Sequence, residues 1–214
     1  MKKRIGIIGS GVVAQTLARG FLRHGHDVML GTQHAEKQAL LRQQVAGATT
    51  GTFKEAAQYG EWVVLSVKGS AALTALKLVD EEALAGKIVM DTTNPIADSP
   101  PQHGVLQYFT SLNRSLMEQL QELRPQARLV KCFSCVGSAH MIDPQFSERP
   151  TMFICGNDAN AKQEVTALLE TVGWDVADMG GAEAARAIEP LAMLWCIPGF
   201  LHNRWNHAFR LLRK

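Results

Sequence analysis

Two glycines and an alanine near the amino terminus have the types and spacing of a phosphate-binding turn. Gly9, Gly11 and Ala14 follow a short β-branched run at residues 5–8, and a helical pattern begins directly after them. Gly9 permits a tight turn, Gly11 lets the backbone approach a pyrophosphate, and Ala14 lets the helix pack closely on the strand. The N-terminus of such a helix offers unpaired N–H groups and a positive dipole. The segment therefore predicts a dinucleotide-binding turn.

The surroundings of this turn are those of a βαβ unit. Apolar residues recur at spacings of three and four across residues 14–22, His24-Gly25-His26 ends that helix, and residues 27–30 read as a second strand. The unit spans roughly thirty residues, as a dinucleotide-binding βαβ unit should. The alternative is an ordinary glycine turn between a strand and a helix, and the context favours the dinucleotide unit.

The rest of the chain alternates between strand-like and helix-like segments. Strand-like segments lie at 62–67, 88–91, 128–133, 151–155 and 175–178, and helical patterns lie at 35–45, 70–80, 111–123 and 159–172. Such alternation predicts an α/β fold of the Rossmann type, a doubly wound, mainly parallel sheet with helices on both faces. We expect one domain over residues 1–214, with a nucleotide-binding core at 1–150 and a C-terminal strand-helix extension at 151–214. The tail from Gly180 is expected to be helical and interrupted near Pro198-Gly199.

Composition narrows the class of protein. The 214 residues carry 22 Lys+Arg against 20 Asp+Glu, a net charge of +2, with no basic patch typical of nucleic-acid binding. No apolar run approaches the length of a membrane span, so we expect no membrane partner. Four cysteines fit a reducing, cytoplasmic location. Cys132-x-x-Cys135 could be a redox pair or half of a metal site, but we interpret both as core residues and predict no metal site.

The residues after the second strand indicate which dinucleotide binds. NAD-binding folds usually place an acidic residue there, to bond the ribose 2′-hydroxyl. This chain instead has Thr32 and Gln33, with Lys37 beyond them. Their hydroxyl, amide and ammonium groups can donate to a 2′-phosphate, which favours NADP over NAD. The alternative is that all three are ordinary polar loop residues.

Several motifs together resemble a known family. The chain resembles the NADPH-dependent coenzyme F420 reductases (F420H2:NADP oxidoreductases) and is similar to the cytosolic NADPH-oxidising domain of the STEAP metalloreductases. The resemblance covers nearly the whole length. Its carriers are Gly9-Ser-Gly-Val-Val-Ala14, Gly31-Thr-Gln with Lys37, Leu65-Ser-Val67, Asp91-Thr-Thr-Asn-Pro95, Val130-Lys-Cys-Phe-Ser-Cys-Val-Gly137, Met152-Phe-Ile-Cys-Gly156 and Asp178-Met-Gly-Gly-Ala-Glu-Ala-Ala-Arg186 with Glu189-Pro190-Leu191.

The resemblance implies a set of cofactor-binding residues. The pyrophosphate contacts fall on Gly9, Ser10, Gly11, Val12 and Val13; the adenosine-phosphate contacts on Thr32, Gln33 and Lys37; and the nicotinamide contacts on Ser66, Val67, Asn94, Pro95, Gly137 and Ser138. Lys68 follows the same strand as Ser66 and either attracts an anionic group or is solvated. The chain departs from the family pattern where the family commonly has arginine at Gln33 and asparagine at Ser134.

The resemblance also implies hydride transfer between NADP(H) and a second planar cofactor, coenzyme F420 first and a flavin such as FAD or FMN second. That reaction needs two stacked rings and no acid or base, so we predict no catalytic side chain. The Tyr-x-x-x-Lys pair of short-chain dehydrogenases is missing, since Val63 and Leu112 stand four residues after the two tyrosines. Two alternatives stay open: a non-catalytic NADP(H)-binding sensor, and a reductase of a small carbonyl or imine, which would need a proton donor.

The tail carries two further expectations. Its apolar residues are too many for one helix of so short a chain to bury alone, which predicts a homodimer. Arg186 and Glu189 stand three residues apart, and we expect them to pair with each other. The apolar residues are Leu191, Leu194, Trp195, Phe200 and Leu201.

Overall fold

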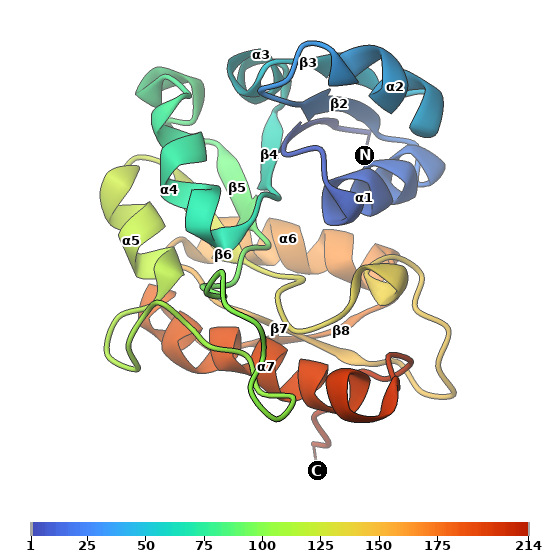
Figure 1. The fold of residues 1–214 in the computed structure, drawn as a ribbon. Coiled ribbons are helices and arrows are strands. Elements are labelled where there is room, and N and C mark those ends of the chain that lie inside the picture. Colours follow the sequence, from blue (N-terminus) through green and yellow to red (C-terminus); the bar gives the residue numbers. More distant parts are fainter. Residues whose placement is uncertain (1, 214) are drawn as a thin grey trace.

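The computed structural model describes residues 2–213, and its centre is a six-stranded parallel sheet in the order β3-β2-β1-β4-β5-β6 (Figure 1). This is the strand order of the Rossmann fold, so the predicted fold class is confirmed. The strands of the sheet are β1 (Arg4–Ile8), β2 (Asp27–Gly31), β3 (Thr49–Gly51), β4 (Trp62–Leu65), β5 (Ile88–Asp91) and β6 (Arg128–Lys131).

Helices cover both faces of the sheet, five of them between these strands and two after β6 in the chain. They are α1 (Val12–Arg23), α2 (Lys37–Gln44), α3 (Phe53–Tyr59), α4 (Gly69–Lys77), α5 (Leu116–Leu123), α6 (Ala159–Thr171) and α7 (Ala185–His202). Alternate strand residues point to opposite faces. Ile5, Ile7 and Val64 join a core with α1 and α6, whereas Val63 and Leu65 join a core with α4 and α5. The sheet is therefore buried on both sides, as a parallel sheet requires.

The C-terminal part adds a second, two-stranded parallel sheet of β7 (Thr151–Ile154) and β8 (Asp175–Asp178). A single antiparallel bridge between Lys131 and Cys155 connects it to β6. Below these strands in Figure 1 runs α7. Residues of β7 and α6 share one core with α1, so this part packs directly on the main sheet. The predicted division at residue 150 stays a prediction.

The tail differs from the sequence-based expectation. Helix α7 continues through Pro198, so the predicted interruption there is wrong. The reason lies in tertiary contacts: the Trp195 indole N–H donates to the His207 carbonyl at 2.8 Å and the two rings stack. The segment after α7 thus folds back on the helix. These contacts offset the cost of an interior proline, about 3 kcal/mol.

By length and composition, Ala182–His202 could cross a membrane; among the described residues no other helix passes that test. Within that stretch the Glu189 carboxylate is buried and accepts hydrogen bonds from the backbone N–H groups of Leu116 and Met117. We therefore interpret it as a packed helix of the α/β fold.

Candidate functional site

A cavity of about 610 Å³ opens at the carboxyl ends of β1, β2, β4 and β5. Ligands of doubly wound sheets bind at this edge, and the volume is that of an ordinary cofactor site, about 300–1,000 Å³. The cavity is lined by Gly9, Ser10, Gly11, Val12, Val13, Thr32, Gln33, His34, Phe53, Ser66, Val67, Lys68, Gly69, Ala71, Thr74, Ala75, Leu78, Thr92, Thr93, Asn94 and Ile96.

The glycine turn forms the centre of the cavity wall, and its two glycines have different roles. Gly9 has a φ of 143°, and a Cβ there would lie 2.0 Å from the Ser66 carbonyl oxygen, so only glycine fits. A Cβ at Gly11 would meet no atom within 4 Å, because that position faces the open cavity. Gly11 is the N-cap of α1, and no side chain caps the helix. The free N–H groups of α1 therefore face a space suited to an anion.

At one end of the cavity lies the turn after β2. Thr32 is buried, and its hydroxyl oxygen accepts a hydrogen bond from the His34 N–H at 3.2 Å. The Ser10 hydroxyl donates to the same oxygen at 3.4 Å, which ties this turn to the glycine turn. Gln33 and His34 are exposed and line the cavity. Polar donors thus surround the position expected for an adenosine phosphate.

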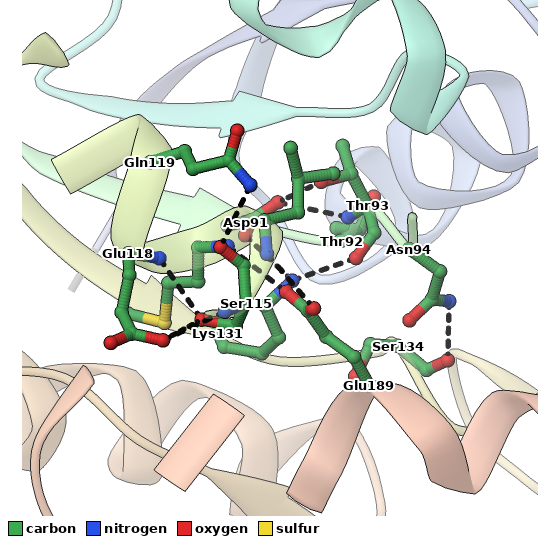
Figure 2. Close-up of polar contacts among 12 residues, drawn as sticks. Asp91, Thr92, Thr93, Asn94, Ser115, Glu118, Gln119, Lys131, Ser134 and Glu189 are labelled. Atoms are coloured by element: carbon green, nitrogen blue, oxygen red, sulfur yellow. Dashed lines mark hydrogen bonds and ion pairs between the residues drawn. The ribbon is translucent and has the colours of Figure 1, made fainter. Parts of the chain in front are cut away.

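Residues after β4, β5 and β6 meet at the other end of the cavity. The Asn94 amide nitrogen donates to the Ser134 carbonyl at 2.7 Å, which fixes the orientation of the amide (Figure 2). Three buried polar atoms there, Ser66 Oγ, Asn94 Oδ1 and Ser134 Oγ, have no hydrogen-bond partner among the described residues. Buried polar groups are rarely left unpaired. Ser66 and Asn94 line the cavity, so these two can bond a polar group of a ligand.

Two of the lining side chains are titratable, His34 and Lys68. His34 is exposed and lies 3.2 Å from the carboxylate of Glu36. Lys68 forms an ion pair with Asp98, which lies on the segment after β5, and this pairing lowers the pKa of the Asp98 carboxyl. Lys68 is therefore paired as well as solvated, and it stands at the mouth of the cavity.

Four of the fifteen candidate residues do not line the cavity. Lys37 begins α2 with an exposed side chain, and Pro95 is buried behind Asn94. Gly137 lies under α7, because a Cβ there would come within 2.4 Å of the Trp195 ring, and Ser138 follows it at the start of a short 3-10 turn. The other eleven are brought together as expected.

Sequence reasoning missed one wall of the cavity. Helix α4 and its C-cap residue Leu78 line the cavity with residues at helical spacing, Ala71, Thr74, Ala75 and Leu78, and Gly69 at the start of the helix lines it too. Thr92 and Thr93 also line it, directly before the candidate Asn94. The i, i+3, i+4, i+7 pattern of α4 is visible in the sequence, but a pattern alone does not say that the face borders a cavity.

The buried polar network beside the cavity corrects one expectation. Arg186 pairs with Glu118 of α5, and Glu189 pairs with Lys131 of β6, so the predicted pairing of Arg186 with Glu189 is wrong. Both side chains reach the N-terminus of α5 but bind different groups there. Arg186 binds the Glu118 carboxylate, whereas Glu189 accepts hydrogen bonds from the backbone N–H groups of Leu116 and Met117. The carboxylate of Glu118 closes a capping box with Ser115 there.

Cys132 and Cys135 are both buried and free of disulfide bonds, in agreement with their interpretation as core residues. Burial raises the pKa of both thiols, that of Cys135 to about 11, which keeps them protonated and unreactive. Within residues 2–213, no group of three or more His, Cys, Asp or Glu side chains is arranged to hold a metal ion.

The family model described as NADP oxidoreductase, coenzyme F420-dependent, matches residues 4–95, which include the glycine turn and Asn94. Metalloreductase STEAP3 of Rattus norvegicus is 30% identical over 203 residues, 92% of this chain and 39% of the relative. The F420-dependent NADP reductase of Methanocaldococcus jannaschii is 30% identical over 142 residues, 66% of this chain and 63% of the relative. This chain thus spans less than two thirds of both relatives.

A solved structure matches over the full length. It is a protein of Arthrobacter sp. FB24 with a provisional assignment as an F420-dependent NADP-reductase, and it is 29% identical with a TM-score of 0.92. The match covers 99% of this chain and 100% of that one. These findings confirm the resemblance indicated by the sequence motifs: the chain is similar to the coenzyme F420-dependent NADP oxidoreductases.

Proposed function

We propose that this protein is an NADP-dependent oxidoreductase that transfers hydride between NADP(H) and a second planar cofactor, with coenzyme F420 the first candidate and a flavin the second. The observation that carries the proposal is the cavity at the carboxyl ends of the strands, with the uncapped N-terminus of α1 at its centre. The comparisons support the enzyme class, an NADP-dependent oxidoreductase.

The residues of the cavity fit a dinucleotide. The open space at Gly11 admits a pyrophosphate, and the free N–H groups of α1 would bond it. At the far end, Ser66 Oγ and Asn94 Oδ1 offer a hydroxyl and an acceptor to a ring amide. Groups able to hydrogen-bond a ligand therefore lie both at the N-terminus of α1 and at Ser66 and Asn94. This supports a ligand that extends along the cavity from one end to the other.

NADP is proposed over NAD because no carboxylate of the turn after β2 lines the cavity, while Gln33 and His34 do. Both side chains have N–H groups able to donate to a 2′-phosphate. For Lys37 to contact a 2′-phosphate, as predicted, its exposed side chain must extend from the start of α2 toward the cavity. Glu36 opposes the choice, since its carboxylate lies beside His34.

In the proposed reaction the protein positions the two reacting rings. When bound, NADPH supplies the hydride. The lining residues hold its ring and shape the space beside it. Of the two titratable lining residues, His34 lies at the other end, and Lys68, which follows β4, is held in an ion pair with Asp98. Tyr108 is not a proton donor to this cavity, because its hydroxyl donates to the Glu189 carbonyl at 2.6 Å and burial raises its pKa. This arrangement favours direct hydride transfer over carbonyl or imine reduction, which needs a positioned acid.

The test is oxidation of NADPH by a panel of acceptors, namely coenzyme F420, FMN, FAD, and simple carbonyls and imines. We expect rapid oxidation with F420 or with a flavin, and none with carbonyls. Binding of NADPH without oxidation by any acceptor would favour the alternative of a sensor. Oxidation by carbonyls or imines alone would contradict direct transfer between rings.

We also propose a homodimer formed through α7. Leu194, Phe200 and Leu201 are each 44–55% exposed on this helix. Trp195, which sequence analysis placed in the same interface, is buried under residues 203–209 and is not available to a partner. We propose that a second copy of the chain covers this surface.

We also propose that the protein is located in the cytoplasm, because the reducing conditions there suit its four free cysteines.

A further inference from the structure

Lys131 is a fully buried lysine whose ammonium group has three partners (Figure 2). Its Nζ lies 2.8 Å from Asp91 Oδ2 and 2.9 Å from Glu189 Oε1. It also donates to the Thr93 carbonyl at 2.7 Å. The ammonium therefore has three oxygen partners, two from the end of β5 and the residues directly after it and one from α7.

The cluster keeps this lysine charged. Burial disfavours the ammonium form, but the carboxylates of Asp91 and Glu189 outweigh burial and raise the pKa of Lys131. Glu189 also accepts from the backbone N–H groups of Leu116 and Met117, each at 3.0 Å. Removing one partner from such a group leaves an uncompensated buried charge, whereas replacing a whole pair is often tolerated.

Only one of the three partners belongs to the cavity wall. Thr93 lines the cavity between Thr92 and Asn94. Its N–H and hydroxyl donate to Asp91 Oδ1 at 2.9 and 2.7 Å, and its carbonyl accepts from Lys131. The N–H, hydroxyl and carbonyl groups of Thr93 are thus all held by Asp91 and Lys131, neither of which lines the cavity. An apolar side chain at position 131 could fill the same volume but could not hold the carbonyl.

We propose that Lys131 is a positioning residue of the cofactor cavity: its ammonium fixes the Thr93 carbonyl and thereby the wall, Thr92 to Asn94, against which the nicotinamide end of NADP(H) rests. The inference rests on the proposed function for the identity of the ligand. Lys131 does not line the cavity, so its effect passes through Thr93.

The test compares two variants of the full chain, K131M/E189Q and E189Q. The double variant removes the ammonium that donates to Thr93 together with the Glu189 carboxylate. It therefore does not leave two buried carboxylates, those of Asp91 and Glu189, without a cation between them. E189Q is the matched control, because it removes the same carboxylate and keeps the bond from Lys131 to Thr93. Thermal unfolding checks that each variant folds. Should the double variant not fold, adding D91N removes the remaining buried charge.

Calorimetry then measures two ligands, NADPH and 2′,5′-ADP, which has only the adenosine half. Relative to E189Q, the double variant should bind NADPH about tenfold more weakly or worse, since a small misplacement near the reacting ring is costly. Its affinity for 2′,5′-ADP, which reaches only the Thr32–Gln33 end, should be unchanged. Equal losses for both ligands, or no loss for either, would overturn the proposal. Failure of the wild-type chain to bind NADPH would refute the proposed function instead.

Discussion

Replacing Gly11 by valine should weaken NADPH binding by about 10²–10⁴-fold and leave the fold intact. The backbone of Gly11 has φ −74° and ψ −175°, an extended conformation open to any residue. A Cβ built there meets nothing within 4 Å, so the added side chain extends into the cavity without a clash in the free protein. It occupies the space that a pyrophosphate needs to reach the N–H groups of α1.

The magnitudes follow from this geometry. Valine in place of glycine at an N-cap costs about 1 kcal/mol of stability, which is roughly 2–4 °C in Tm for a chain of this size. Each lost bond from a backbone N–H to a phosphate costs about 1.5–3 kcal/mol. Loss of two such bonds weakens binding by about 10²–10⁴-fold.

Calorimetry with NADPH and thermal unfolding of the same sample measure both effects. Gly9→Ala is the contrasting variant, because its methyl group would collide with the Ser66 carbonyl and force a strained backbone. We expect G9A to lower Tm more than G11V does. Normal NADPH affinity of G11V would refute the assignment of the glycine turn as the pyrophosphate site.

Three further predictions concern selectivity, pH and assembly. Gln33→Arg should raise the preference for NADPH over NADH, measured by calorimetry with both cofactors, because arginine binds phosphate through two hydrogen bonds; an unchanged ratio would argue against a 2′-phosphate at this turn. Hydrogen bonding from Arg186 lowers the pKa of Glu118 to about 2, so its stabilising contribution is complete above pH about 4.5 and is lost as pH falls toward 2; R186M should flatten the pH dependence of Tm in that range, and an identical profile would contradict it. Light scattering should show a dimer at micromolar concentration, converted to monomer by L194E/F200E, and a monomeric wild-type chain would disprove the interface.

Local chemistry explains which features could be read from the sequence. The turn at Gly9 and Gly11 could be predicted because a strand, two glycines and a helix are all specified within residues 5–22. The carboxyl ends of parallel strands meet at one edge, so Thr32, Ser66 and Asn94 could be placed together without a structure. The short strand β3 and helix α3 were not foreseen, because three residues of strand carry no clear alternation.

Features that depend on long-range packing could not be read in this way. Nothing local indicates that Gly137 lies under Trp195, because the two residues come from distant parts of the chain. Nor does anything local indicate that α7 continues through Pro198, since the segment after α7 folds back on the helix. The pairing of Glu189 with Lys131 joins residues 58 positions apart, and the sequence shows only a helical i, i+3 spacing to Arg186. Buried ion pairs of this kind are decided by the packed structure.

Transfer of isotope from NADPH to the acceptor tests the central claim most directly. NADPH deuterated at the transferred position is mixed with the protein and coenzyme F420 in ordinary water, and the reduced acceptor is analysed by mass spectrometry. Because the titratable side chain nearest Ser66 in the cavity wall, Lys68, is held in an ion pair with Asp98, hydride should pass straight between the two rings, and the acceptor should carry the deuterium. Deuterium released to water, with none in the reduced acceptor, would contradict the account.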